Sequence, residues 1–205
     1  MCIRDSSWPF SRVHEIQPHA GTTRTWATVN GWLDECRAGH QRCVSSVSST
    51  WYPKRLLRLA PSSPGQEGRI RLIYTDNDRP SSAYVALSHC WGGKSGLVNT
   101  VTSESGLLQG VQWNELPNTF RDAITVVRNI RMEYLWIDSL CIQQDNRADW
   151  AQHAQCMDKV FQHAQLTIAA TTSANSSECF LHSGEEGPLI VTRSRMRLLW
   201  RDVSL

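Results

Sequence analysis

The sequence lacks any apolar run close to the length of a membrane span, which takes about 20 residues. It also lacks an excess of charge of one sign, because 21 Lys and Arg residues are set against 19 Asp and Glu residues. A nucleic-acid-binding domain usually carries a clear basic excess. We therefore expect neither a membrane protein nor a partner of nucleic acid.

A complete phosphate-binding loop is also absent. The run Gly92-Gly93-Lys94-Ser95 follows an apolar stretch, but the pattern requires another glycine at the position that Ser88 occupies. No clear helical pattern follows the run, so no helix N-terminus is expected there to hold a phosphate. These two departures exclude an ordinary nucleoside triphosphatase.

The seven cysteines lack the arrangement of a disulfide framework, because they are scattered and contain no Cys-x-x-Cys pair. Cys36, His40 and Cys43 would supply half of a zinc site, but a second pair at suitable spacing is missing. Cys90 and Cys141 lie in apolar runs, where a free cysteine behaves as a small buried hydrophobe. We expect a cytoplasmic protein with free thiols and without a metal.

The chain divides into three parts. The first six residues, MCIRDS, reverse-translate into the transposon end used to build sequencing libraries, so we interpret residues 1–6 as adapter read-through and exclude them from fold reasoning. Residues 7–80 form a lead-in of short elements, and residues 83–205 form the main domain. The Ser-rich stretch 45–50 is expected to be a linker within the lead-in.

Periodicity predicts few elements in the lead-in. Apolar residues spaced three and four apart between Thr25 and Cys36 indicate one face of a short helix. Short apolar runs over 55–59 and 69–74 are typical of strands, and the Pro- and Gly-containing stretch between them is typical of a loop.

The main domain shows a regular alternation of patterns. Continuous apolar runs over 84–91, 134–138 and 166–170 indicate buried strands. Helical spacing begins at Pro117 and again after Asp145 or Asn146, either of which would cap the second helix, between those strands. Strands that alternate with helices predict an α/β fold with a parallel βαβαβ sheet and right-handed crossovers, preceded by a helical or irregular N-terminal extension.

Ligands of such sheets bind beyond the carboxyl ends of the strands. Those ends are expected at residues 88–93, 138–144 and 171–175. The residues expected to line a cleft there are Ser88, Trp91, Gly92, Gly93, Asp138, Gln143 and Trp150.

Three residues near these ends, Asp138, Cys141 and His153, are candidates for catalysis. Asp138 ends an apolar strand, where it either caps the following turn or faces the cleft. Cys141 would be a nucleophile if His153 or His163 served as its base, and the alternative is an inert thiol in the core.

Trp91, Trp136 and Trp150 are expected either to line the wall of one cleft together or to pin the sheet to its helix.

At these residues the sequence resembles the fungal heterokaryon-incompatibility (HET) domain. The matching segments, which occur in the family's order, are 84–92 (YVALSHCWG), 116–124 (LPNTFRDAI), 134–143 (YLWIDSLCIQ), Asp149-Trp150 with Met157 and Phe161, and 164–170 (AQLTIAA) running on to Phe180. A later family block with Trp and Gln-Glu is missing, and an Arg-rich end over 193–201 stands in its place. We therefore interpret the chain as a fragment that is truncated or diverged at its C-terminal end.

The resemblance implies a role in nonself recognition that leads to programmed cell death, with protein partners and possible self-association of the domain. It also implies a flavodoxin-like fold similar to TIR domains, some of which hydrolyse NAD by means of a Glu on a helix near a Trp. The family pattern Asp-Trp-x-x-Glu places that Glu at the position of His153, and an imidazole cannot act as a permanent carboxylate. We expect no cofactor and poor NAD hydrolysis. The alternatives are an NAD- or nucleotide-processing enzyme and a hydrolase that uses Cys141.

Overall fold

The computed structural model describes five stretches of chain with their side chains and one further strand by its backbone. These are residues 21–39, 51–60, 68–93, 96–171 and 173–181, and strand residues 191–192. The sequence predictions for the adapter-like residues 1–6, the linker 45–50, Cys43 and the Arg-rich end 193–201 lie outside the described residues.

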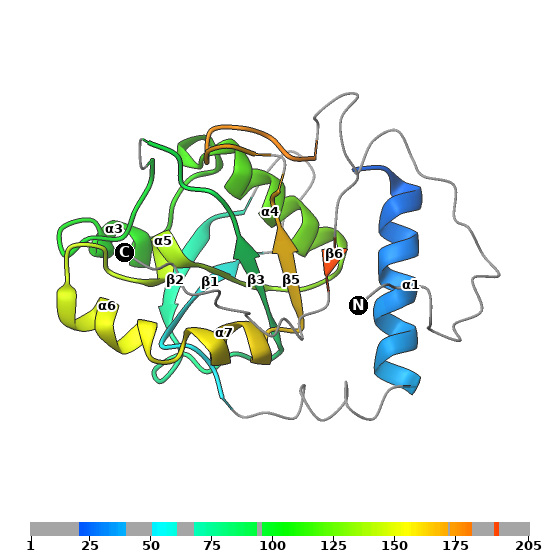
Figure 1. Ribbon diagram of the computed structural model, residues 1–205, viewed down its shortest axis with the longest axis horizontal. Coiled ribbons are helices and arrows are strands. Elements are labelled where there is room, and N and C mark those ends of the chain that lie inside the picture. Colours follow the sequence, from blue (N-terminus) through cyan, green and yellow to red (C-terminus); the bar gives the residue numbers. More distant parts are fainter. Residues whose placement is uncertain are drawn as a thin grey trace, which may run out of the picture.

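A six-stranded sheet forms the centre of the molecule, in the order β2-β1-β4-β3-β5-β6 (Figure 1). Its strands are β1 (Arg55–Leu59), β2 (Ile70–Tyr74), β3 (Tyr84–Ser88), β4 (Tyr134–Ile137), β5 (Leu166–Ala169) and β6 (Val191–Thr192). The helices are α1 (Thr23–Gly39), α3 (Glu104–Gln109), η2 (Trp113–Glu115), α4 (Asn118–Asn129), α5 (Asp138–Cys141), α6 (Arg147–Ala154) and α7 (Met157–His163). The predicted α/β fold is confirmed.

The middle of the sheet is parallel. Strand β3 pairs with β4 on one side and with β5 on the other, so the chain crosses first to one flank of β3 and then to the opposite flank. This order is that of the first three strands of flavodoxin-like sheets, in which ligands bind where the crossover direction reverses. The carboxyl ends of β3, β4 and β5 therefore lie together at one edge, as the sequence predicted.

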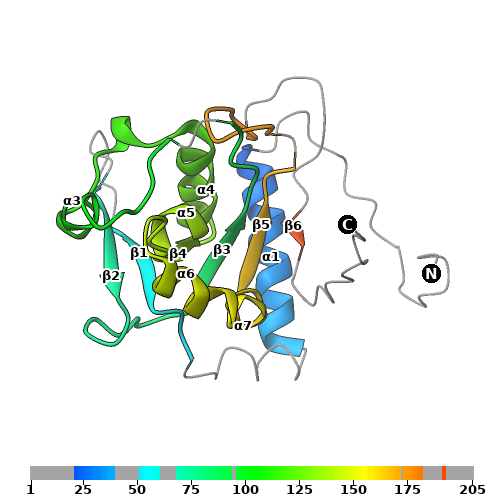
Figure 2. The same cartoon turned by 60° about the vertical axis from the view of Figure 1, so that its left-hand side comes forward.

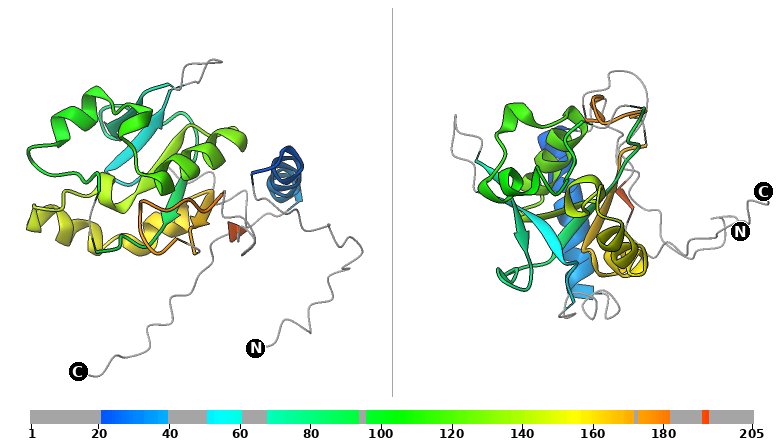
Figure 3. Two further views of the ribbon diagram at one scale, coloured as in Figure 1. Left: turned by 90° about the horizontal axis from the view of Figure 1, so that it is seen from above. Right: turned by 90° about the vertical axis from the view of Figure 1, so that its left-hand side faces the viewer.

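Side-chain alternation along the strands assigns a helix to each face. Tyr84 donates a hydrogen bond to the Val160 carbonyl in α7, and the Trp136 ring meets the edge of Phe161 in the same helix. The strand residues that alternate with Tyr84 and Trp136 point to the opposite face of the sheet, where α4 packs. Helices α4 and α7 therefore lie on opposite sides of the sheet (Figure 3). The expectation that a tryptophan pins the sheet to its helix holds for Trp136.

The predicted strands of the lead-in extend the same sheet rather than forming a separate unit. Strand β1 pairs antiparallel with both β2 and β4, with Leu57 opposite Leu135. The predicted N-terminal helix is also present as α1, which buries Trp26, Val29 and Leu33 as part of the common core. Figures 1 and 2 show α1 towards the β5–β6 end of the sheet and α3 at the opposite end, beside β2.

The helical pattern after Asn146 is two helices instead of one. The Asn146 side chain accepts from the amides of Ala148 and Asp149 and so caps the start of α6. The helix ends at Ala154, and α7 begins at Met157 after a short turn.

Candidate functional site

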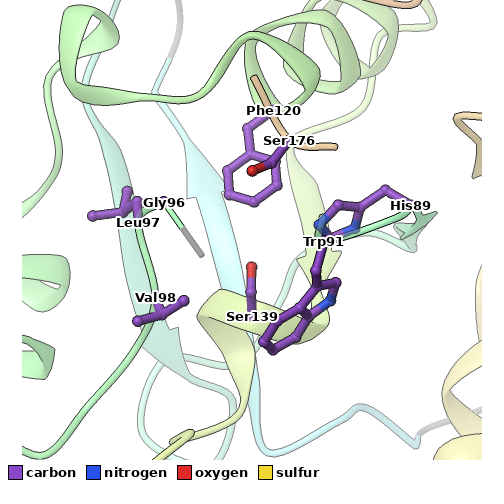
Figure 4. Close-up of a pocket in the computed structure, with 8 residues that line it drawn as sticks. All are labelled: His89, Trp91, Gly96, Leu97, Val98, Phe120, Ser139 and Ser176. Carbon is purple, nitrogen blue, oxygen red and sulfur yellow. The ribbon is translucent and has the colours of Figure 1, made fainter. Parts of the chain in front are cut away.

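A pocket opens at the carboxyl ends of the parallel strands, on the face that α4 covers. It is partly open to solvent and has room for about one water molecule. Figure 4 shows His89 and Trp91 on one side, with Phe120 and Ser176 above and Ser139 below. The lining residues are His89, Trp91, Gly96, Leu97, Val98, Phe120, Ser139 and Ser176.

Asp138 forms hydrogen bonds with two residues that line this pocket, Trp91 and Ser139. It is the first residue of α5, directly after β4, and its carboxylate accepts from the Trp91 indole N–H at 2.8 Å and from the Ser139 amide at 2.7 Å. Asp138 thus bonds to the adjacent Ser139 amide and to the lining residue Trp91, but it is neither the cap residue of α5 nor a residue that lines the pocket. A carboxylate with two strong donors is a positioning group, since these bonds fix the indole against the end of the strand.

Among the described residues that line the pocket, His89 is the titratable group that points into it (Figure 4). Its side chain is 1% exposed, and its Nδ1 lies 3.7 Å from Asp138 Oδ1, too far for a hydrogen bond. The ring meets Phe120 edge-on, with 5.2 Å between the ring centroids. Burial lowers the pKa of His89 below 6.5 even though the Asp138 charge opposes this shift. His89 is therefore a neutral imidazole at pH 7, with one donor and one acceptor.

The chain makes a close backbone approach at Gly92, directly after the lining residue Trp91. Gly92 has φ +73°, and a Cβ atom placed there would lie 2.3 Å from the Asn175 Cβ. Ser88 and Gly93 are exposed beside it, and the Ser88 carbonyl accepts from the Ala170 amide. The predicted residues Ser88, Gly92 and Gly93 are thus sequence neighbours of the lining residues His89 and Trp91 and lie next to the loop after β5, but they do not line the pocket.

Gln143 belongs to a different cluster, a buried group of charges centred on Asp149. Asp149 accepts from Arg55 Nη1 at 2.8 Å, from Lys54 Nζ at 2.7 Å and from the Gln143 amide at 3.0 Å. The side chains of Arg55 and Asp149 are each 2% exposed. Arg55 Nε also lies 3.1 Å from Glu104 Oε1, at an angle that makes no hydrogen bond. This cluster joins β1, α3 and α6.

His153 is part of the charge cluster and does not line the pocket. Its Nδ1 lies 2.8 Å from the Asp149 carbonyl oxygen, and its side chain is 2% exposed. Burial lowers the pKa of His153 below 6.5, against the opposing effect of Asp149. A neutral, enclosed imidazole in this place has no access to a substrate in the pocket.

Cys141 lies in the core and is not placed for nucleophilic attack. It has no exposed surface, and burial raises the pKa of its thiol to about 12. A thiolate is the reactive form of cysteine. The structure therefore does not support the hypothesis that Cys141 is a nucleophile, and it supports the alternative that Cys141 is an inert thiol of the core.

Thiol reactivity should follow this burial. In the native chain, Cys90 and Cys179 are exposed and should react with iodoacetamide quickly, whereas Cys141 should react at least about a thousandfold more slowly. The difference arises because modification of a core thiol requires opening with nearly the full free energy of unfolding. Peptide mass spectrometry over time measures both rates, and rapid labelling of Cys141 in the folded chain would contradict its assignment to the core.

The three tryptophans expected to share a cleft are separated by the fold. Trp91 lines the pocket, Trp136 is 1% exposed in the core, and Trp150 is 56% exposed on α6. The expectation of a common wall is wrong because Asp149 and His153 occupy the inward face of α6 and turn the indole of Trp150 to solvent. Trp150 therefore does not line the cleft.

Several residues of the site were not predicted. Phe120 and Ser176 come from α4 and from the loop after β5, which approach the end of β3 only in the folded chain. Arg55 was missed because an arginine at the start of a strand is ordinarily exposed. His89 and Ser139 had a signal that could have found them, since both lie within the strand ends expected at residues 88–93 and 138–144.

In the described parts of the chain, no group of three or more His, Cys, Asp or Glu side chains is arranged to hold a metal ion. Likewise, none of the described helices is both long enough and apolar enough to cross a bilayer.

The fold and the pocket define a mixed α/β domain with a small site of aromatic and polar side chains at the carboxyl ends of parallel strands. Searches of curated proteins and of solved structures gave no match. The model of the family described as heterokaryon incompatibility protein (HET) matches residues 84–200, which is more than half of the chain. The chain belongs to this family, as the resemblance of its sequence blocks indicated, and the family description implies a role in heterokaryon incompatibility.

Proposed function

We propose that this chain is a signalling module of fungal nonself recognition that leads to programmed cell death through protein contacts, including self-association. The observation that carries the proposal is the family match over residues 84–200. A cytoplasmic location fits this role, and the proposal requires neither a cofactor nor NAD turnover.

The geometry supports contact rather than NAD turnover. The pocket has room for about one water molecule, whereas typical small-molecule sites enclose roughly 300–1,000 Å³. His153, at the position of the Glu in the family pattern Asp-Trp-x-x-Glu, is a buried neutral group beside Asp149. A carboxylate there would lie next to a second buried carboxylate, which indicates that the surroundings of residue 153 suit an imidazole.

Trp150 is the strongest candidate for a contact residue. Its side chain is one of the three large hydrophobic side chains exposed in the described chain, the others being Trp32 and Val101. The neighbouring Asp149 is anchored by Arg55 and Lys54, so α6 presents the indole from a rigid support. Exposed aromatic side chains are enriched at protein interfaces and often carry much of their binding energy.

Expression of the full chain in a filamentous fungus tests the proposal. Viability should fall while cellular NAD stays constant, and Trp150→Ala should reduce killing at equal protein level. Gln152→Ala, an exposed residue of the same helix, serves as the matched control and should leave killing unchanged. A fall in NAD that precedes death would instead support the enzyme of the TIR-like class, and survival of cells that contain the folded chain would refute a role in cell death.

A further inference from the structure

Two of the three large hydrophobic side chains that the described chain exposes belong to segments joined at the start of α6. Trp150 is 56% exposed and Val101 is 63% exposed. The Asp145 carboxylate accepts from the Val101 amide at 3.0 and 3.2 Å, and Asp145 directly precedes Asn146, the cap of α6. Helical side chains lean towards the N-terminus of their helix, so the Trp150 indole is directed towards this end. The third, Trp32, lies on α1, at the opposite end of the molecule (Figure 1).

Two exposed charges of opposite sign lie at the same place. Arg147 is the first residue of α6 and lies one turn before Trp150, on the same side of the helix. Across the described chain, Arg147 has no hydrogen bond and no ion pair, not even with Asp145. Asp145 uses its carboxylate only for the Val101 amide, and a carboxylate has about four acceptor positions. We call Val101, Asp145, Arg147 and Trp150 together the α6 patch.

The chemistry of the α6 patch selects its partner. A matching surface has to supply a carboxylate for Arg147, a cation for Asp145 and apolar surface for Trp150 and Val101. A strongly acidic or strongly basic partner would satisfy one of the two charges and be repelled by the other. The α6 patch itself supplies all of these groups. In a two-fold symmetric pair, any contact from one residue to another occurs twice, so Arg147 and Asp145 would form two ion pairs around the apolar side chains.

The α6 patch is also held in place before any partner binds. On the inward side of α6, Asp149 accepts from Arg55 and from Lys54, and Asn146 caps the first turn. Little further ordering of this helix is therefore needed on association, which lowers the entropy lost in binding. Trp and Arg are also the residue types that most often dominate the binding energy of an interface.

We propose that the α6 patch is a symmetric dimer interface, in which Arg147 of one copy pairs with Asp145 of the other and the two Trp150 indoles pack between these ion pairs. This inference rests on the proposed function, of which self-association is a part, and assigns that self-association to a surface. One short helix and one turn are smaller than a standard interface of about 800 Å² per partner, so we expect a dissociation constant of about 1–100 µM.

Sedimentation equilibrium of the purified full chain over a range of concentrations tests the apolar part of the interface. Trp150→Ala should weaken the dimer by at least about thirtyfold, the effect of removing a central aromatic side chain. Trp32→Ala is the matched control, because it removes the other exposed indole from the opposite end of the molecule and should leave the dissociation constant unchanged.

Exchange of the two charges tests the pairing. Arg147→Asp and Asp145→Arg should each weaken the dimer by about tenfold or more, because each places like charges opposite one another at two sites. A mixture of the two variants should form a heterodimer about as tight as the wild-type dimer, since both ion pairs are then restored with their signs reversed. If Asp145→Arg does not fold, Arg147→Lys, which keeps the charge, should dimerise much more tightly than Arg147→Asp.

The proposal is overturned if the chain stays monomeric at about 1 mM, if Trp32→Ala weakens the dimer as much as Trp150→Ala, or if neither the charge exchange nor Arg147→Lys restores binding. These results are separate from the viability assay. A dimer that follows the expected pattern in a chain that does not kill cells would refute the proposed function and leave the interface assigned. Killing by a chain that stays monomeric would refute the interface alone.

Discussion

Replacement of Asp149 with asparagine should lower the free energy of unfolding by about 3–5 kcal/mol. The change removes the counterion of Arg55, whose side chain is 2% exposed, and leaves a guanidinium buried with only the more distant Glu104 nearby. It also weakens the bond that the Gln143 amide donates to this carboxylate. Urea unfolding followed by tryptophan fluorescence measures the loss. The same substitution at Asp158, an exposed acid of α7, should change stability by less than about 0.5 kcal/mol.

The pH dependence of the stability lost in Asp149→Asn shows whether the carboxylate charge is the source of that loss. Burial alone would raise the pKa of Asp149, but hydrogen bonds from Arg55 and Lys54 outweigh it and hold the pKa well below its ordinary value of 3.8. A carboxyl whose pKa is lower in the folded chain stabilises the fold above its unfolded pKa and loses that contribution as the pH falls. The difference between wild type and Asp149→Asn should therefore be constant at neutral pH and shrink below about pH 4. A difference that does not change with acidification would show that the carboxylate charge is not the source.

Replacement of Gly92 with alanine should destabilise the chain by about 2–5 kcal/mol and push apart the loops that meet at Gly92 and Asn175. A non-glycine residue in the left-handed region costs about 1–2 kcal/mol, and Gly92 has φ +73°. The added methyl group would lie 2.3 Å from the Asn175 Cβ, and overpacking of this kind costs about 1–3 kcal/mol. Thermal and urea unfolding measure the sum.

Two further variants separate the two contributions. Gly93→Ala is the matched control, because a Cβ at Gly93 meets nothing within 4 Å, and its effect should be small. Asn175→Gly, combined with Gly92→Ala, removes the atom that clashes. The double variant should recover the stability lost to overpacking and keep the loss caused by the strained backbone. If Gly92→Ala is as stable as Gly93→Ala, the close approach of these two loops is not required for the fold.

The parallel core was predictable because each strand and helix carries its own local pattern. The runs that became β3, β4 and β5 are almost wholly buried, and α4 shows clear helical spacing after Pro117. Their alternation sufficed to place the carboxyl ends at one edge. Asp138 and Trp91 were therefore found from sequence as residues of the site.

The remaining parts of the site depend on contacts that no local pattern records. The antiparallel pairing of β1 with β4 joins residues 57 and 135, and nothing in either run specifies its partner. The phase of α6 was misjudged for Trp150 because an ion pair, not an apolar stripe, determines which side of this helix is buried. Asp149 and His153 face inwards since Arg55 reaches α6 from another strand.

Strand β1 has a practical consequence for the boundaries of this domain. The family match begins at residue 84, yet the cations that neutralise Asp149 come from residues 54 and 55. A product expressed from residue 83 onwards would leave one edge of β4 without its hydrogen-bonding neighbour. It would also leave the buried Asp149 carboxylate without its positively charged partners. The smallest autonomously folding version of the module therefore has to include the antiparallel hairpin that precedes the matched region.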